Sequence, residues 1–157
     1  MNNPISVEIK GLKEMSDQLA QLPGKIARRA LTAAVREGVN VWRAAARARA
    51  PVGTKTYKDW RGKTHRPGLL KKSGVITKKL KVRDPQNTAL FGVGFSKRSY
   101  YGKWIERGKA VKHTQAARPF VVPVLEQKGE EAVRALKKRL GEELAAIVKS
   151  TPGLSLK

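Results

Sequence analysis

The stretch from Lys25 to Ala50 most constrains how this chain folds, because it predicts one long amphipathic helix. Its many alanines give it a high intrinsic helix propensity. Apolar side chains recur along one broad stripe, made of Ile26, Ala30, Leu31, Ala34, Val35, Val41, Trp42 and Ala45. Arg29, Arg36 and Arg43 fall seven residues apart on the opposite side. We therefore expect a core helix with a solvated basic back, rather than a short helix that reads DNA bases.

Three further segments flank this helix. Ile5, Val7 and Ile9 alternate with polar residues, which predicts a half-buried strand over residues 5–9. Leu12, Met15, Leu19 and Leu22 recur at helical spacing, which predicts a short helix that ends at Pro23 and Gly24. A last helix is expected from Pro123 to about Lys149, with residues 150–157 as a frayed end. Its apolar stripe consists of Val133, Leu136, Leu140, Leu144 and Ile147.

Two strands that form a hairpin are predicted in the middle of the chain. Over Ser73–Val82 the residues alternate, with Ile76, Leu80 and Val82 on one side and Val75, Thr77, Lys79 and Lys81 on the other. Asp84-Pro85-Gln86-Asn87 is a turn sequence. Thr88–Phe95 returns with an apolar face opposite Gly92 and Gly94, which leave room for a helix or another backbone. One α+β domain over residues 1–157 follows, with a small antiparallel sheet against a long N-terminal helix and a C-terminal helix.

Residues 51–72 form a long basic segment with little periodicity, which is too long for an ordinary connection in a compact domain. We expect it to be an extended basic arm. Tyr57 and Trp60 are candidates for stacking on bases or for packing on another subunit, and a solvated loop is the third reading. The basic residues considered as candidates for contact with DNA are Lys55, Lys58, Arg61, Lys63, Arg66, Lys71 and Lys72.

The formal charge of the chain is +22, from 34 Lys and Arg against 12 Asp and Glu. A compact monomer with this charge repels itself, so an anionic partner or an assembly with matched charge is expected. Nucleic acid is the commonest partner of this kind, and acidic protein surfaces come next. Neither a signal peptide pattern nor an apolar run of membrane-spanning length occurs, so we expect a soluble protein with no membrane partner.

The stretch from Tyr100 to Pro123 carries the features that suggest a site. A short helix is expected over Tyr100–Arg107, with Ser99 as its cap and Gly108 as its end. Phe120 follows as an extended residue that we expect to be buried against the last helix. Glu106 is the only carboxylate between Asp84 and Glu126. Its isolation among bases suggests an ion pair with another subunit or with the arm, so that Glu106→Lys would block assembly without unfolding the monomer.

The sequence offers little for catalysis. Cysteine is absent, and the two histidines, His65 and His113, lie in basic loops without an acid cluster nearby. A metal site, a nucleophile–histidine–acid arrangement and a pair of catalytic carboxylates therefore lack their side chains. The glycines in residues 91–95 sit inside a strand rather than before a helix, which makes phosphate binding a weak match. We expect no enzyme activity and no cofactor.

Five short motifs in a fixed order carry a family resemblance. They are Ala50-Pro51-Val52, Pro67-Gly68-Leu69-Leu70-Lys71-Lys72-Ser73, Val93-Gly94, Tyr100-Tyr101-Gly102-Lys103-Trp104-Ile105-Glu106-Arg107-Gly108 and Ala117-Arg118-Pro119-Phe120. Together they resemble the tail-completion proteins of long-tailed bacteriophages, also called head–tail joining or neck proteins, a group that includes the minor tail protein Z type. The resemblance covers roughly residues 10–145.

This resemblance implies a structural virion protein that forms a ring, with six as the expected number of subunits. The ring would complete the tail and join it to the head connector, with the tail terminator or tail tube as a further neighbour and non-specific contact with the genomic DNA in the channel. The protein would act in the virion neck after assembly in the host cytoplasm. The residues expected at subunit or partner contacts are Tyr57, Trp60, Tyr100, Tyr101, Trp104, Glu106, Arg118 and Phe120. The alternative is a free nucleic-acid-binding module that ignores sequence, such as a nucleoid or RNA-binding protein.

Overall fold

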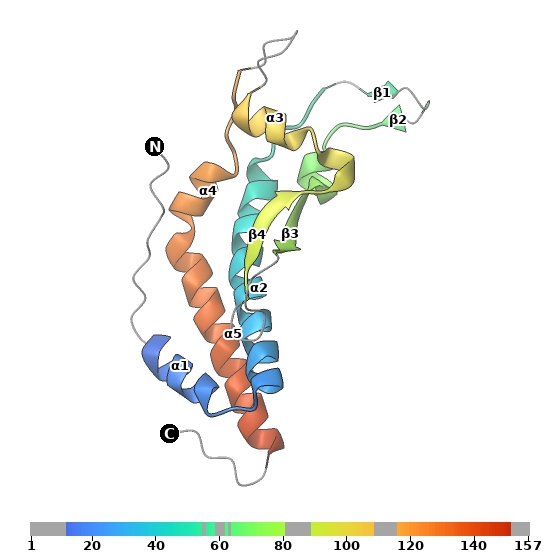
Figure 1. Cartoon of the computed structure of the whole chain (residues 1–157). Coiled ribbons are helices and arrows are strands. Elements are labelled where there is room, and N and C mark those ends of the chain that lie inside the picture. The colour runs from blue at the N-terminus through green and yellow to red at the C-terminus, as the bar shows by residue number, and fades with distance from the viewer. Residues whose placement is uncertain are drawn as a thin grey trace.

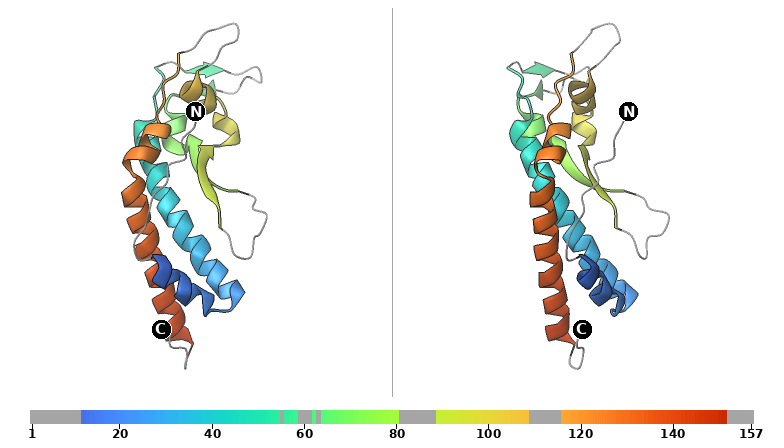
Figure 2. Two further views of the ribbon diagram at one scale, coloured as in Figure 1. Left: turned by 60° about the vertical axis from the view of Figure 1, so that its left-hand side comes forward. Right: turned by 90° about the vertical axis from the view of Figure 1, so that its left-hand side faces the viewer.

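A computed structural model describes residues 12–54, 56–58, 62, 64–80, 89–108 and 116–151. The long helices α2 (Gly24–Arg49) and α5 (Gly129–Ser150) run antiparallel and side by side, and the short helix α1 (Leu12–Ala20) lies at one end of this pair (Figures 1 and 2). The strands β3 (Val75–Lys79) and β4 (Phe91–Phe95) form a small antiparallel sheet beside α2. The helices α3 (Gly102–Arg107) and α4 (Val122–Gln127) lie towards the other end. The fold is therefore α+β, as predicted.

The helix pair is held by a core of small and branched side chains. Ala30 and Ala34 of α2 are almost fully buried with Leu140 and Leu144 of α5, and Leu22 closes the cluster beside α1. The small alanine side chains let the two helices approach closely, so many atom pairs reach van der Waals contact distance. Gly38 marks the tightest point, because a Cβ there would stand 2.9 Å from the carbonyl oxygen of Ala132. The predicted stripe of α5 is confirmed at Leu140 and Leu144. The stripe predicted for α2 is confirmed at Ala30 and Ala34, whereas Ile26 is exposed. The other buried residues of α2 are Gly38, Val39 and Ala46, which were not predicted.

The sheet packs on α2 through the side of β3 that carries Val75 and Thr77. Val75 is fully buried, and its carbonyl oxygen accepts a hydrogen bond of 2.8 Å from Nε of Arg47. The hydroxyl of Thr77 donates to Oδ1 of Asn40 at 3.1 Å. Gly92 and Gly94 lie on the other side, where Leu80 and Lys78 side chains approach them. The expectation that these glycines admit a helix or another backbone was wrong, since side chains of the partner strand occupy that space.

A second core cluster joins the sheet to the segment that precedes α4. It contains Ala46, Ala50, Leu70, Val75 and Phe120. Phe120 is only 4% exposed, and its ring centroid lies 6.0 Å from that of Phe95. The predicted burial of Phe120 is confirmed.

The structure also changes several boundaries. The first strand begins at Val75 rather than Ser73, because a π-helical turn, η1 (Leu70–Gly74), occupies the preceding residues. The last helix is divided at Lys128, where φ is −108° and ψ is 15°, next to Gly129, a residue of low helix propensity. The predicted strand at residues 5–9, the turn at residues 84–87 and residues 152–157 lie outside the described residues.

The predicted arm contains a short antiparallel pair in its described part. Strands β1 (Tyr57–Lys58) and β2 (Thr64–His65) pair Tyr57 with His65 and Lys58 with Thr64. Gly62, between them, has φ of 73°, a value that favours glycine. Figure 1 shows β1 and β2 away from the helix pair, beyond the end of α2.

Two glycine substitutions test the close helix contact. Gly38→Ala should lower the free energy of unfolding by about 1–3 kcal/mol, because the new methyl group meets a backbone oxygen that cannot rotate away. Gly141→Ala is the matched control on α5, where the nearest atom to a new Cβ is Cε of Met15 at 3.8 Å. That variant should gain up to about 1 kcal/mol from helix propensity. Urea unfolding measures both, and equal effects would contradict the packing described.

Candidate assembly surface

The chain segment that leads into α3 is held in place by a contact between two short helical turns. Ser99 ends the 3₁₀ turn η2 (Lys97–Ser99) and is fully buried. Its hydroxyl donates to the carbonyl oxygen of Gly74 at 2.8 Å and lies 2.7 Å from Oγ of Ser96. The expectation that Ser99 caps the following helix was wrong, because its hydroxyl is used against Gly74 and α3 has no side-chain cap. Gly74 permits this approach, since a Cβ there would stand 2.9 Å from Ser99.

Helix α3 is held at both ends by glycine. A Cβ on Gly102 would stand 2.5 Å from the ring of Phe95, so the helix can rest on that ring only with glycine there. Gly108 ends the helix with φ of 77° and ψ of 169°, a backbone conformation found essentially only in glycine. The predicted end of the helix at Gly108 is therefore confirmed, while its start moves from Tyr100 to Gly102.

Glu106 is the central residue of this region. Its side chain points into the protein and is only 9% exposed. One carboxylate oxygen accepts hydrogen bonds from the backbone N–H groups of Phe120 at 2.9 Å and Val121 at 3.0 Å, and the other from Val121 at 3.2 Å and Val122 at 2.9 Å. Three successive N–H groups before and at the start of α4 are thus satisfied by one carboxylate. Charge-assisted bonds of this kind are stronger than neutral ones.

This geometry revises the role predicted for Glu106. The sequence suggested an ion pair with another subunit or with the arm, whereas the carboxylate is bonded to the backbone of its own chain. A second bond, from the N–H of Arg118 to the carbonyl oxygen of Ile105 at 2.8 Å, joins the same two segments. The physical reason is that the amides at a helix start have no partner within the helix, and a buried carboxylate supplies one. Glu106 therefore fixes the surface mainly through its bonds to the backbone, and only a small part of its side chain is exposed, at the groove described next.

A groove of about 430 Å³ runs between β4, α3 and the start of α4. Val93, Gly94 and Phe95 line one side of it, and Val121 and Val122 another. Its charged lining residues are Lys78, Lys103, Arg107 and Glu106, and the Glu106 carboxylate is bonded to backbone amides of its own chain. Val122 is 50% exposed here although it is apolar. The groove is thus partly apolar and surrounded by cations, a combination that suits a partner segment with apolar and acidic side chains.

The edge of β4 beside the groove is open in the described part of the chain. Ser96 pairs with Gly74 and Leu80 with Leu90 through backbone bonds, so alternate residues of β4 point their N–H and C=O groups at β3. The backbone groups of Phe91, Val93 and Phe95 therefore point away from β3. Such an edge can accept an added strand from another chain.

The predicted contact residues have different surroundings. Tyr100 is 56% exposed, and its ring meets that of Trp104 edge-on at 5.2 Å between centroids, with Nζ of Lys103 5.6 Å from the Trp104 ring. Tyr101 is half-buried and packs on the second core cluster. Phe120 belongs to that core, so its predicted place on a subunit surface was wrong.

Arg118 was also predicted at a contact but does not line this groove. Arg118 is exposed and lines another cavity of about 320 Å³ with Arg66, Tyr101 and Val52. Tyr57 lies in β1, and Trp60 lies outside the described residues. Of the bases predicted to face DNA, Lys58, Arg66, Lys71 and Lys72 are exposed, whereas Lys55, Arg61 and Lys63 lie outside the described residues. Sequence reasoning missed Lys78, Val121 and Val122, because nothing in a sequence pattern shows which strand face and which turn border a groove.

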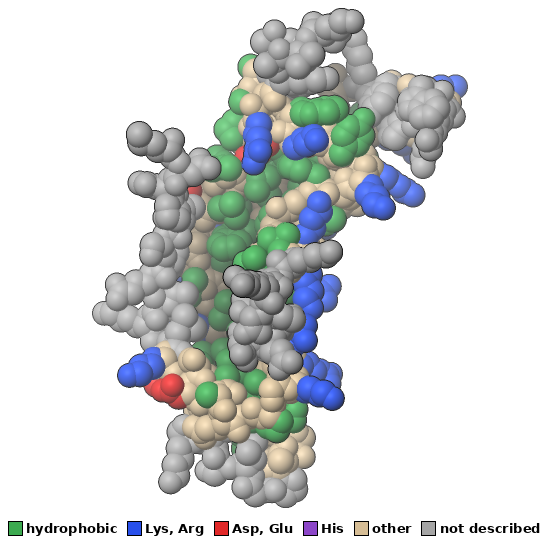
Figure 3. All heavy atoms as spheres, viewed as in Figure 1, with side chains coloured by type: hydrophobic (Ala, Val, Ile, Leu, Met, Phe, Trp, Pro, Cys, Tyr) green, Lys and Arg blue, Asp and Glu red, His purple; other side chains and the backbone are tan. Residues whose placement is uncertain are grey.

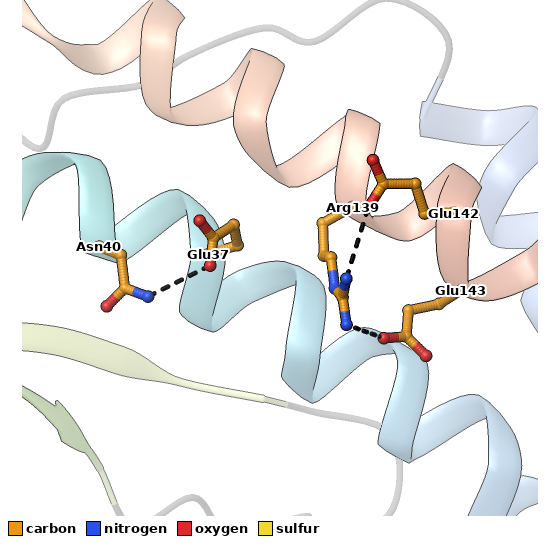
Figure 4. A network of polar contacts seen from close by, with 5 residues as sticks. All are labelled: Glu37, Asn40, Arg139, Glu142 and Glu143. Atoms are coloured by element: carbon orange, nitrogen blue, oxygen red, sulfur yellow. Dashed lines mark hydrogen bonds and ion pairs between the residues drawn. The ribbon is translucent and has the colours of Figure 1, made fainter.

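Polar contacts on the long helices are of the ordinary exposed kind. Arg139 contacts Glu142 at 3.4 Å and Glu143 at 2.6 Å, and Nδ2 of Asn40 donates to Glu37 at 3.2 Å (Figure 4). Pairs of this type contribute little to stability. Among the residues that the structure describes, no group of His, Asp or Glu could hold a metal ion, and no helix is long and apolar enough to cross a membrane.

Comparisons with models of protein families, with curated proteins and with solved structures give no match to this chain. The family resemblance therefore rests on the order and identity of the sequence motifs, and a function drawn from it is a proposal.

Replacement of Glu106 by glutamine tests its structural role. Glu106→Gln should lower the free energy of unfolding by about 2–3 kcal/mol, because the amide offers one acceptor atom and turns N–H donors towards other N–H donors. Glu126→Gln is the control on α4, where the side chain is exposed, and should change stability by less than about 0.5 kcal/mol. Thermal unfolding followed by circular dichroism compares them, and similar melting temperatures would refute the role given to Glu106.

Proposed function

We propose that this protein is a structural virion protein of a long-tailed bacteriophage. It forms a ring at the head-proximal end of the tail, completes the tail and joins it to the head connector. Its partners are further copies of itself, the connector or head-closure proteins, and the tail terminator or tail tube protein. The protein catalyses no reaction in this role and requires no cofactor.

The observation that carries this proposal is the bond between two of the family-like motifs. Tyr100–Gly108 supplies Glu106, and Ala117–Phe120 leads into the amides that the Glu106 carboxylate binds. Two separate motifs thus build one fixed surface, which is what a chain selected for assembly needs. Motif residues that bond to each other support the resemblance more strongly than motif residues scattered over the fold would.

The groove beside β4 gives this surface a way to contact a neighbour. Lys78, Lys103 and Arg107 would repel the same cations in the groove of a second copy, so a contact at this groove is expected to join unlike surfaces of two copies. Contacts between unlike surfaces close into a ring when the rotation between subunits permits. A ring by this route buries Val122 and places the Lys78, Lys103 and Arg107 cations against acidic side chains of the neighbour.

The alternative, a free nucleic-acid-binding module, is favoured by the formal charge of +22. The two functions differ in the state of the purified protein. A free module stays monomeric and binds nucleic acid tightly, whereas a tail-completion protein forms rings or copurifies with tail and head-connector proteins.

Native mass spectrometry with a surface variant tests the proposed ring. The wild-type protein should give a closed oligomer, with six copies as the expected number. Val122→Lys should shift the population to monomer, because the ammonium group would be buried among cations in the contact. Val148→Lys is the matched control, since Val148 is 37% exposed on α5 near the opposite end of the molecule.

The melting temperature of each variant should stay close to that of the wild type, because both valines are exposed. A wild-type protein that is monomeric at all concentrations, alone and with its tail and connector proteins, would overturn the proposed function. A ring that forms equally well in Val122→Lys would instead place the contact elsewhere.

A further inference from the structure

The charges of this protein are distributed unevenly over its two ends. Within the described residues from Gly38 to Leu125 the only carboxylate is that of Glu106, which is buried against backbone amides. The exposed Lys and Arg residues of that part are Arg49, Lys58, Arg66, Lys71, Lys72, Lys78, Lys79, Lys97, Arg98, Lys103, Arg107 and Arg118. On the face in Figure 3, Lys and Arg side chains follow the right-hand edge and the upper part, and few Asp or Glu side chains are visible.

The two ends also differ in how their bases are paired. On α5, Arg139 contacts Glu142 and Glu143, and Lys128 contacts Glu131 at 2.5 Å. The end with β3, β4 and α3 has no exposed carboxylate among its described residues, so its cations have no such neighbours there. Like charges close together raise the free energy of the folded chain, and a bound polyanion removes that cost.

Four of these Lys and Arg residues lie on two turns that contact each other, an arrangement that the sequence alone does not reveal. Lys71 and Lys72 lie in η1, and Lys97 and Arg98 lie in η2. Gly74 holds the two turns together, because its carbonyl oxygen accepts bonds of 2.8 Å from the N–H of Ser96 and from the hydroxyl of Ser99. All four side chains are exposed. We call this group the basic cluster.

The chemistry of the basic cluster favours phosphates over a protein surface. The four residues are all Lys or Arg, and Ser73 in η1 and Ser96 beside η2 are polar, so these side chains supply no apolar centre. Stable protein–protein contacts need such a centre, whereas contacts with a nucleic-acid backbone need only cations and hydrogen-bond donors. None of the four residues is aromatic, and the nearby Tyr100, which follows η2, packs edge-on against Trp104.

We propose that the basic cluster is a binding site for the phosphate backbone of double-stranded DNA, independent of base sequence. Each of the four cations neutralises a phosphate, and release of condensed counterions drives the binding. The η1–η2 contact fixes the positions of the cations, so the site is present before DNA arrives. This site goes beyond the proposed ring and does not depend on it, because the four residues belong to one chain.

The test compares two variants that each remove two positive charges. Lys97→Gln with Arg98→Gln removes half of the basic cluster, and Lys138→Gln with Lys149→Gln removes two exposed cations from α5. Fluorescence anisotropy with a labelled duplex of mixed sequence, over a series of salt concentrations, gives the affinity and its dependence on salt. The first variant should bind about tenfold more weakly at low salt, with a slope of log K against log salt that is smaller by about 2.

For the α5 variant, the slope of log K against log salt should match that of the wild type to within about 0.5, which corresponds to roughly half a phosphate contact. Lys71→Gln with Lys72→Gln should repeat the loss, which guards against a local effect of η2 on folding. Equal losses in the cluster and α5 variants would show that net charge alone attracts DNA, and that overturns the site. Absence of wild-type binding at low salt, equal binding of a single strand, or equal competition by poly-glutamate would each overturn the proposal. None of these results bears on the ring, which the native mass reports separately.

Discussion

The Glu106 carboxylate stabilises the end of the protein that contains α3 and α4. It binds the backbone amides of Phe120, Val121 and Val122, and so joins α3 to the start of α4. Phe120 then enters the core beside Phe95, and Val122 is left exposed next to the open edge of β4. Without this carboxylate three adjacent amides would lose their partners, at a cost that a domain of marginal stability could not easily offset. The position of the proposed assembly surface depends on this one side chain.

The two ends of the molecule have different physical tasks. Around Ala30, Ala34, Leu140 and Leu144 the helices bury apolar surface, and α5 carries exposed carboxylates, two of which contact Arg139. Around β3, β4 and α3 the exposed charges are all positive in the described residues, and the groove and the basic cluster lie there. One end therefore supplies stability, and the other supplies contacts. In a ring built from such subunits, both a neighbouring protein and DNA can be bound by the second end at separate places.

Much of the fold was predictable because helical periodicity is a local signal. The helix expected over Lys25–Ala50 is found as α2 within one residue at each end, and Phe120 is buried as expected. The roles of Ser99 and Glu106 were not predictable, because each depends on a contact with a distant segment. An isolated acid among bases suggests an ion pair, and only the fold reveals that backbone N–H groups satisfy it. Lys71 and Lys72 were predicted to face DNA, but their proximity to the turn with Lys97 and Arg98 was not predictable, because it depends on the contact between η1 and η2.

Hydrogen exchange of the wild-type protein by NMR tests the central claim most directly. The amide hydrogens of Phe120, Val121 and Val122 precede or begin a helix, so in the absence of an acceptor they should exchange quickly. Since the Glu106 carboxylate accepts all three, we predict exchange as slow as that of the Val124 and Leu125 amides, which bond to the carbonyl oxygen of Val121. Exchange of the three amides at the rate of exposed loop residues, with α4 still protected, would contradict this account.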